Sequence, residues 1–212
     1  MLRSLYLSPL GYLISFILNI VGIVFHPFMV YGYWNRVSGK FRRFTRISST
    51  ALILNKNQFD IGDNCWIWHH SIIDSSNGVK IGEGVQIGAW VGIFSHSSHV
   101  AIRLHGRHYI EVDKNERVGY VRGAVEIGDY SFIGASAIIF PGVKIGRGCV
   151  IAAGAVVNKD IPDFSIASGN PAKIIGKTSD LDQNYFDKQI VRDQYFDRQV
   201  VDSYLAENES KK

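Results

Sequence analysis

Cysteine is scarce in this chain, and its scarcity excludes two kinds of architecture. Only two cysteines, Cys65 and Cys149, occur among 212 residues. They form no Cys-X-X-Cys motif, so they supply neither a disulfide framework nor a zinc knuckle, and nothing in their usage indicates an oxidising compartment. Both occupy small-residue positions of the sequence repeat described below. We therefore expect two buried free thiols.

Charge is absent from the stretch between Leu5 and Tyr33, which contains no Lys, Arg, Asp or Glu. Within it, residues 10–25 are nearly all apolar and approach the length of about 20 residues that spans a bilayer. Pro9 and Asn19 interrupt the run, and no small-residue cleavage site of a secretory signal is present. The sequence fits one span, an interfacial helix or a re-entrant helical hairpin. Helices buried against the rest of the chain or at a subunit contact are the alternative.

Basic residues follow directly, between residues 36 and 46. By the positive-inside rule they place the downstream chain on the cytoplasmic side. We expect residues 1–48 to form a hydrophobic, membrane-associating helical segment with a basic flank, at the cytoplasmic face of the inner membrane. The net charge of the whole chain is only +4, and no nucleic-acid-binding motif accompanies the basic patches. A nucleic-acid partner is therefore not expected.

A six-residue repeat runs without a slip from Ile127 to Pro162. Its blocks read IGDYSF, IGASAI, IFPGVK, IGRGCV, IAAGAV and VNKDIP. A period this short excludes helical repeats and predicts a parallel β-helix, in which each block is one short strand plus a corner and three blocks close one triangular coil. The aliphatic side chains would point inward and stack between coils, while small residues would fit the crowded corners.

The same repeat begins earlier, at Ile61, and is interrupted twice. The step from Ile73 to Ile81 is eight residues instead of six, which predicts a bulged corner at residues 75–78. The second break is much longer and predicts a loop, residues 97–123, that leaves the β-helix. Long excursions from a regular scaffold are usually functional or disordered, and a tolerated surface insertion is the alternative.

The length of the chain suits one core with attachments. We assign residues 49–177 to the β-helix domain. Residues 178–212 are polar and contain two nearly duplicate segments, YFDKQIVRD and YFDRQVVDS. We expect this C-terminal tail to be helical and to lie on the surface or at a subunit contact.

The most specific stretch of the sequence closes the repeat: residues 133–176 read IGASAIIFPGVKIGRGCVIAAGAVVNKDIPDFSIASGNPAKIIG. This stretch is similar to the closing signature of the hexapeptide-repeat acyltransferases, including its Asn-Pro-Ala-Lys exit. The whole of residues 61–177 resembles that family, and most closely its polysaccharide and sugar O-acetyltransferases. The resemblance implies an all-β solenoid, a left-handed parallel β-helix, here with a helical N-terminal segment and a C-terminal helix. General rules would have favoured right-handed crossovers.

The resemblance also implies a catalytic histidine directly before the inserted loop, where this chain has His96. Acetyl transfer from a thioester needs a base that titrates near neutral pH to take the proton of the acceptor hydroxyl, and imidazole meets that need. Direct attack requires no Ser or Cys nucleophile, and backbone N–H groups at the corners would stabilise the oxyanion. The alternative is that His96 only turns a corner.

Five further residues are candidates for acceptor binding: His70, Asp74, His99, Arg103 and His105. His70 and Asp74 lie where related sugar acetyltransferases contact the acceptor, although Trp68 replaces an Asn that some of them carry. His99 follows His96 closely, and the two loop residues would meet an acidic or hydroxylated sugar. Structural or solvated roles are the alternatives.

The acyl donor that the resemblance implies is acetyl-CoA, and no metal is expected. The matching positions are Ala135 and Ala153 along the pantetheine arm, Asn158 and Lys159 beside it, and Lys173 near the nucleotide phosphates. The resemblance further implies a homotrimer with active sites between its subunits.

The leading prediction is therefore an acetyl-CoA-dependent O-acetyltransferase with a His general base. Its acceptor would be a sugar hydroxyl in a surface-polysaccharide precursor, such as a lipid-linked saccharide for lipopolysaccharide, capsule or exopolysaccharide. Three alternatives stay open: a soluble serine- or xenobiotic-type acetyltransferase, a zinc lyase of the carbonic-anhydrase type with His ligands from adjacent subunits, and a non-catalytic trimeric scaffold.

Overall fold

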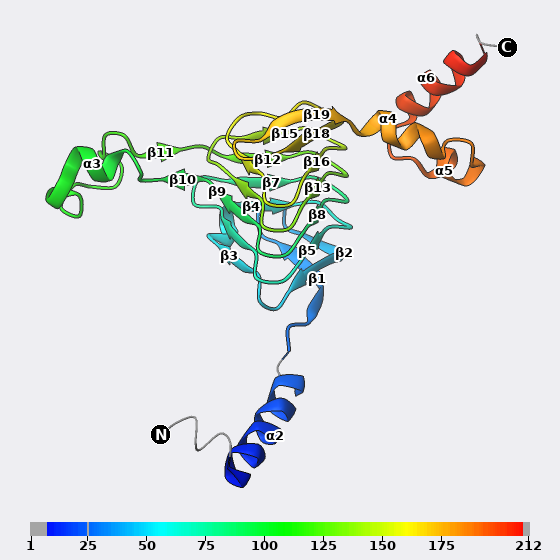
Figure 1. Ribbon diagram of the computed structural model, residues 1–212. Helices are drawn as coiled ribbons and strands as arrows, with labels where there is room; N and C mark the ends of the chain where they lie inside the picture. The colour runs from blue at the N-terminus through cyan, green and yellow to red at the C-terminus, as the bar shows by residue number, and fades with distance from the viewer. Residues whose placement is uncertain (1–7, 25, 210–212) are drawn as a thin grey trace.

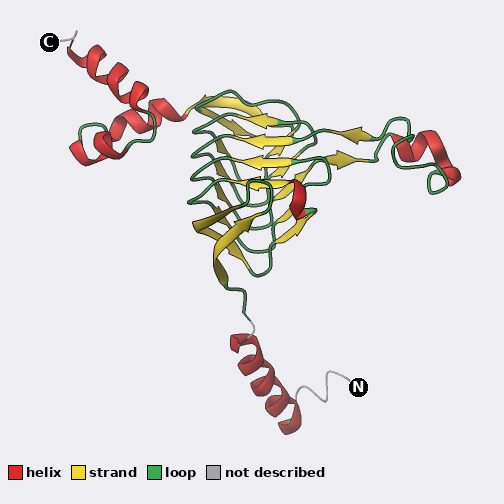
Figure 2. Cartoon of the chain, turned by 180° about the vertical axis from the view of Figure 1, so that it is seen from behind, coloured by secondary structure: helices red, strands yellow, loops and turns green. Residues whose placement is uncertain are grey.

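The centre of the molecule is a three-sided parallel β-solenoid of about six turns, as the repeat predicts. The computed structural model describes residues 8–24 and 26–209, and Figures 1 and 2 show the stacked coils from opposite sides. Each coil contributes one short strand to each of three sheets, named A, B and C below. The chain passes from sheet A to sheet B to sheet C and then starts the next coil.

Sheet A holds the parallel strands β2 (Lys40–Ser48), β5 (Trp66–Ile67), β8 (Gln86–Ile87), β13 (Phe132–Ile133), β16 (Val150–Ile151) and β18 (Ser165–Ser168), with the antiparallel strands β1 (Met29–Asn35) and β19 (Lys173–Lys177) at its ends. Sheet B holds β3 (Leu52–Leu54), β6 (Ile72–Asp74), β9 (Gly92–Phe94), β14 (Ile138–Ile139) and β17 (Val156–Val157). Sheet C holds β4 (Phe59–Ile61), β7 (Val79–Ile81), β12 (Val125–Ile127) and β15 (Lys144–Ile145). The short helix η1 (Lys56–Gln58) turns the first corner between sheets B and C.

Three ladders of inward aliphatic side chains form the core. The ladders are Ile47, Ile67, Ile87, Ile133, Ile151 and Ala167 in sheet A, Ile53, Ile73, Ile93, Ile139 and Val157 in sheet B, and Ile61, Ile81, Ile127, Ile145 and Ile161 in sheet C. All of them are buried except Ile47, which is partly buried. Side chains alternate between the two faces of a strand, so one residue per hexad meets its equivalent in the next coil.

Both interruptions of the repeat leave the ladders in register. The corner at residues 75–78 absorbs the longer step with Gly78 in the left-handed region, at a φ of 95°. The long insertion starts and ends at an antiparallel pair, β10 (His96–Ser97) and β11 (Val121–Arg122), and Ile81 still pairs with Ile127 across it. Between those strands lie α3 (Ala101–His105) and η2 (Gly106–His108), which project from the solenoid (Figure 1). Residues 97–123 are called the arm below.

The outer faces of sheets B and C differ in chemistry. On sheet C the in-register residues Asp60, Lys80, Glu126 and Lys144 alternate in charge, and Lys144 Nζ lies 3.1 Å from Glu126 Oε1. On sheet B the equivalent outward row is Leu52, Ile72, Gly92, Ile138 and Val156. A ladder of alternating charge suits solvent, whereas an exposed apolar row suits a protein contact.

The N-terminal region corrects part of the sequence prediction. Helix α2 (Pro9–Val24) is apolar and helical as expected, but β1 and β2 form an antiparallel hairpin where residues 29–48 were expected to be helical. The cause is Ile47, which pairs with Ile67 and makes β2 the first strand of sheet A. Aromatic and β-branched residues in this stretch also favour strands. Among the described residues, no helix combines the length and apolar character needed to cross a membrane.

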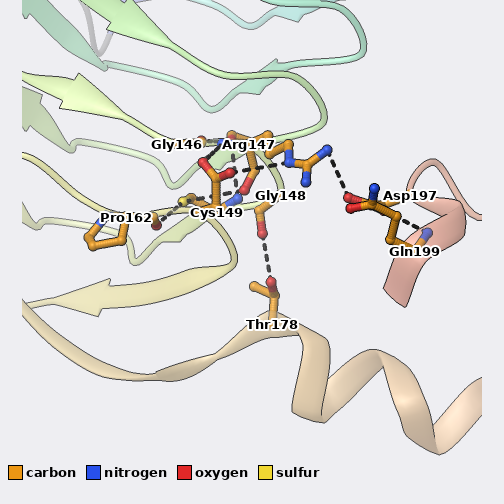
Figure 3. Close-up of polar contacts among 10 residues, drawn as sticks. Gly146, Arg147, Gly148, Cys149, Pro162, Thr178, Asp197 and Gln199 are labelled. Atoms are coloured by element: carbon orange, nitrogen blue, oxygen red, sulfur yellow. Dashed lines mark hydrogen bonds and ion pairs between the residues drawn. The ribbon is translucent and has the colours of Figure 1, made fainter. Parts of the chain in front are cut away.

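The C-terminal helices are joined to the last coils by a short polar network (Figure 3). They are α4 (Thr178–Asp182), η3 (Gln183–Tyr185), α5 (Gln189–Gln194) and α6 (Arg198–Glu209). The Thr178 hydroxyl donates to the Gly148 carbonyl oxygen at 2.7 Å, and Arg147 Nη1 lies 2.8 Å from Oδ2 of the buried Asp197. Phe196 stacks on Tyr130. These contacts fix the root of the tail, from which α6 extends away from the solenoid (Figure 1).

The two cysteines are buried and free, as the sequence predicts. The Cys65 Sγ–H donates to the Gly82 carbonyl oxygen at 3.0 Å. Burial raises the pKa of the Cys65 thiol to about 11, and burial also raises the pKa of Cys149. Both side chains therefore stay protonated at neutral pH and serve as small packing groups.

The ladders predict that neighbouring residues of β7 differ strongly in their contribution to the free energy of unfolding. Replacing the buried Ile81 with Ala should lower the free energy of unfolding by about 2–5 kcal/mol, because a cavity opens between two coils. Lys80 faces solvent on the same strand, and replacing it with Ala should change the free energy of unfolding by less than about 0.5 kcal/mol. Urea denaturation followed by circular dichroism measures both variants. Equal losses would contradict the assignment of inward and outward positions.

Candidate active site

His96 stands where the third coil breaks into the arm. It is the first residue of β10, two positions after β9 ends, and its side chain is 30% exposed. The preceding Ser95 is buried, and its hydroxyl accepts a hydrogen bond from the Asn77 backbone N–H at 2.9 Å. The core therefore holds the backbone just before His96, while the imidazole itself remains accessible from one side.

Asp74 lies directly behind the His96 imidazole. His96 Nδ1 is 2.6 Å from Asp74 Oδ2, and the Asp74 side chain is only 5% exposed. Asp74 Oδ1 accepts hydrogen bonds from the Ser76 backbone N–H at 2.9 Å and from its hydroxyl at 2.5 Å, which fixes the carboxylate. The imidazole is turned so that its Nδ1–H is not aligned on the carboxylate, and the two groups lie close together without a well-aligned hydrogen bond. A carboxylate at Nδ1 favours the tautomer that leaves Nε2 free to accept a proton.

This geometry gives Asp74 a different role from the one that the sequence predicts. The sequence predicts an acceptor-binding residue, but Asp74 is covered by its neighbours and contacts His96 instead. The two residues are 22 positions apart in the sequence, which is one coil with its bulged corner plus two further residues. Register across sheet B, in which Asp74 pairs with Phe94, brings the carboxylate to the histidine two residues later.

Tyr120 covers the imidazole from the arm. The two rings are nearly parallel, at 9°, with centroids 5.6 Å apart. The guanidinium of Arg122 lies 4.5 Å from the centroid of the Tyr120 ring, and Lys114 Nζ lies 5.9 Å from it. Burial raises the pKa of the Tyr120 phenol. The pairing of His96 with Arg122 at the root of the arm places this aromatic stack.

Sequence reasoning did not single out Tyr120, although a signal for it existed. A loop that leaves a solenoid and re-enters the same coil must bring its first and last residues together. Residues just before the repeat resumes were therefore the ones to examine beside His96.

The remaining acceptor candidates divide into two groups. His99, Arg103 and His105 belong to the arm: His99 Nδ1 lies 2.8 Å from Ser97 Oγ, and Arg103 donates to the His99 carbonyl oxygen. His105 Nε2 is buried and has no hydrogen-bond partner among the described residues. His70 lies away from them, at the corner between sheets A and B, and is stacked on Trp90.

The donor candidates also divide into two groups. Ala135 and Ala153 lie at successive corners between sheets A and B, where the Gly154 N–H donates to the Ala135 carbonyl oxygen at 2.8 Å. Lys173 begins β19 beside the next such corner and is exposed. Asn158 and Lys159 are exposed at the corner between sheets B and C. These two corner rows are called the AB edge and the BC edge.

Within one chain, the candidate base and the small-residue wall lie on opposite edges of sheet B. His96 is on the BC edge, and the AB corner of the same coil is at Trp90, six residues earlier. Six extended residues span about 20 Å. A ligand lying along Ala135 and Ala153 is therefore remote from the His96 of its own chain. The two halves meet only if the AB edge of one chain faces the BC edge of another.

No group of three or more His, Cys, Asp or Glu side chains is placed to hold a metal ion in the part of the chain that the structure describes.

Comparison with known proteins matches the solenoid on both sides of the arm. The family model described as the hexapeptide repeat of succinyl-transferase matches residues 59–93 and 124–159. The galactoside O-acetyltransferase of Escherichia coli (strain K12) is 32% identical over 154 residues, which cover 68% of this chain and 70% of that protein. Serine acetyltransferase 2 of Arabidopsis thaliana is 28% identical over 190 residues, 90% of this chain and 54% of that protein.

A protein of Saccharomyces cerevisiae named as an acetyltransferase is 40% identical over 124 residues, 58% of this chain and 57% of that protein. The chain thus spans little more than half the length of the yeast and Arabidopsis relatives. Among solved structures, a galactoside acetyltransferase in complex with coenzyme A superposes with a TM-score of 0.53 at 29% identity, over 66% of this chain and 64% of that one.

The stack of Tyr120 on His96 yields a testable expectation. Tyr120→Ala should lower the turnover number of the acetyl transfer predicted above about tenfold, because an imidazole free to rotate spends less time in productive geometry. Tyr120→Phe keeps the ring and should stay close to wild type. Histidine NMR spectra provide a second readout: the ring-current shift of His96 should vanish in the Ala variant and persist in the Phe variant. Equal activity of all three proteins would rule out a positioning role.

Proposed function

The chain belongs to the hexapeptide-repeat acyltransferases, and we propose that it is an O-acetyltransferase that moves the acetyl group of acetyl-CoA to a hydroxyl of a sugar. The contact of His96 with the buried Asp74 carries this proposal, because it places a carboxylate at Nδ1 while Nε2 has no hydrogen-bond partner among the described residues at the root of the arm. The likeness to a galactoside O-acetyltransferase over two thirds of both chains favours a sugar hydroxyl as the acceptor.

The proposed reaction is a direct transfer. His96 Nε2 takes the proton of the acceptor hydroxyl as the oxygen attacks the thioester carbonyl, and a tetrahedral oxyanion forms. The intermediate collapses with cleavage of the carbon–sulfur bond. The proton on His96 then goes to the departing thiolate, which yields the acetyl ester and the free thiol of CoA. Asp74 orients the imidazole and stabilises its protonated form.

The small side chains of the AB edge support its assignment to the pantetheine arm of acetyl-CoA. Ala135 and Ala153 carry the smallest side chains that keep a Cβ, and a Cβ added at Gly154 would meet nothing within 4 Å. The corner is therefore open to solvent. Lys173, at the last corner of this row, would meet the nucleotide phosphates, and Lys159 would approach from the BC edge of a neighbouring chain.

We assign the active site to the junction between copies in a homotrimer. The separation of His96 from the AB edge of its own chain requires a second copy to complete the site. The exposed apolar row on sheet B, which includes Leu52, Ile72 and Ile138, lies between those two edges. A heterologous contact of AB edge to BC edge must close into a ring to avoid open polymers, and three solenoids with parallel axes form the smallest such ring.

A serine-type acetyltransferase is the second candidate. The match to serine acetyltransferase 2 of Arabidopsis extends over 90% of this chain. In this alternative the same base acts on the hydroxyl of a free amino acid. The exposed basic and histidine side chains of the arm fit either a hydroxylated sugar or a carboxylate.

The N-terminal region supports an acceptor held at the cytoplasmic face of a membrane, as in a lipid-linked polysaccharide precursor. No Asp or Glu occurs before Asp60, whereas residues 36–46 include five Arg and Lys. The hairpin of β1 and β2 also exposes large aromatic side chains: Tyr31, Trp34, Phe41 and Phe44. Helix α2, which precedes the hairpin in the chain, also exposes apolar residues, among them Leu13, Phe16 and Ile17. Aromatic and basic side chains together are typical of surfaces that bind anionic lipid headgroups.

Replacing His96 tests the catalytic half of the proposal. His96→Ala should lower the turnover number by about 10²–10⁴, the usual contribution of a general base. Binding of CoA, measured by calorimetry, should remain. The assay follows release of the CoA thiol with galactosides and, in parallel, with L-serine, so that it separates the two candidate acceptors. His108→Ala, which removes an exposed histidine of the arm that contacts Glu111, is the matched control. Near-normal turnover in the His96 variant would remove it as the base.

Charge removal on the hairpin tests the membrane half. Each basic side chain near an anionic surface contributes about 1 kcal/mol, so the double variant Lys40→Ala, Arg43→Ala should partition at least about tenfold less onto phosphatidylglycerol vesicles. Phosphatidylcholine vesicles should show a smaller effect. Co-sedimentation measures the partition, with Lys177→Ala, Lys188→Ala as the charge-matched control at the other end of the chain. Unchanged binding to anionic vesicles would exclude the hairpin as the lipid contact.

A further inference from the structure

An unbroken series of aromatic rings leads across the outside of the second and third coils to the AB edge. It runs through Trp66, Trp68, His69, His70 and Trp90, with successive centroid distances of 5.2, 4.9, 6.3 and 5.9 Å. The last pair is stacked, with His70 and Trp90 inclined by only 15°. Sheet register sets this arrangement, because the Trp90 N–H donates to the His69 carbonyl oxygen in the coil below.

The two final residues of the series occupy corners that disfavour them. His70 and Trp90 have φ values of 59° and 57°, in the left-handed region, and the equivalent corner two coils above Trp90 is Gly154. A bulky side chain in that region is uncommon and costs of order 1–3 kcal/mol, and such outliers cluster at functional sites. Tyr130 and Phe164 also occupy left-handed corners, but both pack on Phe196, whereas Trp90 remains largely exposed.

These side chains face solvent instead of the core. Trp90 is 63% exposed and Trp68 is 39% exposed. Beside them, an open groove of about 370 Å³ is lined by Trp68, Phe132, Ala89 and Ala135, among others. Ala135 is also the first residue of the small-residue wall on the AB edge. The aromatic series thus adjoins the lower end of the proposed pantetheine groove.

We infer that Trp90, with His70 and Trp68, forms a stacking platform for the acceptor, and that the acceptor is a neutral pyranose ring. The inference rests on the proposed O-acetyl transfer and names the substrate class of that site. A pyranose offers an apolar face of C–H groups that matches an exposed indole, while its hydroxyls can bond to the ring nitrogens of His70. Because the platform lies below Ala135, the bound ring would lie next to the thioester end of the donor.

Other occupants fit the observations less well. A charged acceptor would require ionic partners, but the groove is lined by no Lys, Arg, Asp or Glu, and the guanidinium of Arg46, 4.5 Å from the Trp66 ring centroid, lies at the other end of the series from Trp90. A second copy of the chain could cover an apolar patch, but an open groove beside Trp68 and Ala135 is there for a smaller ligand. A free amino acid such as serine has no apolar face with which to stack on an indole.

The test uses methyl β-D-galactopyranoside and maltotriose as probes and compares wild type with Trp90→Gly. Glycine restores the corner that Gly154 uses, so the variant should fold at least as well as wild type. Saturation-transfer NMR on the full chain, irradiating aromatic protons without acetyl-CoA present, should mark the C–H face of at least one sugar. That signal should be lost in Trp90→Gly. Tyr185→Ala removes an exposed aromatic residue of the tail and serves as the control, in which the saturation-transfer signal should remain.

Steady-state kinetics give the second readout. Trp90→Gly should raise the KM for the sugar about tenfold, the loss typical of removing a central aromatic contact, and leave kcat and the KM for acetyl-CoA within about twofold. Trp90→Phe should recover part of the affinity. No saturation transfer to either sugar in wild type, or equal transfer in the glycine variant, would overturn the platform. Sugar binding that depends on Trp90 without acetyl transfer would instead refute the proposed function and leave the platform standing.

Discussion

The in-register stacking of inward isoleucines is the constraint on which the rest of this structure depends. Ile81 pairs with Ile127 although the whole arm lies between them in the sequence. The energetic reason is that a slip by one residue would turn buried side chains outward along an entire strand. The solenoid therefore tolerates insertions only at corners, and both interruptions of the repeat are found there. A functional insertion in this fold is therefore confined to the corners between strands.

The same register turns the corners into straight rows, and this fixes where a ligand can bind. The AB edge carries Trp90, Ser136 and Gly154 one above another, each bonded to the coil below. His96 lies on the opposite edge of sheet B. A rigid prism cannot fold these two edges together, because each strand between them is buried on its inner side. A hinge within the chain is thus excluded as a way to complete the site, and for this reason we propose that the site lies between copies.

The sequence predicted those features that periodicity encodes and missed those that depend on neighbouring coils. The inward ladders, the corner at residues 75–78 and the break after His96 follow from counting six residues at a time. The contact of Asp74 with His96 does not, since it arises from pairing across sheet B with the bulged corner included. Tyr120 escaped notice because the arm has no repeat of its own. The β1–β2 hairpin was taken for helix because hydrophobic content dominated, although Ile47 already began the ladder.

Asp74 shows why the candidate site coincides with the insertion. Its side chain lies on the outer side of sheet B, in the same row as Leu54 and Phe94, yet it is almost fully buried. The cover comes from His96 and the root of the arm, so the buried polar environment is built outside the aliphatic core. A carboxylate buried there needs compensation, which the two hydrogen bonds from Ser76 provide, and its Oδ2 lies 2.6 Å from His96 Nδ1. A bare solenoid face, solvated on its outer side, cannot hold a carboxylate in this way. The arm therefore adds to the regular solenoid a site in which the His96 imidazole contacts Asp74 on one side and stacks on Tyr120.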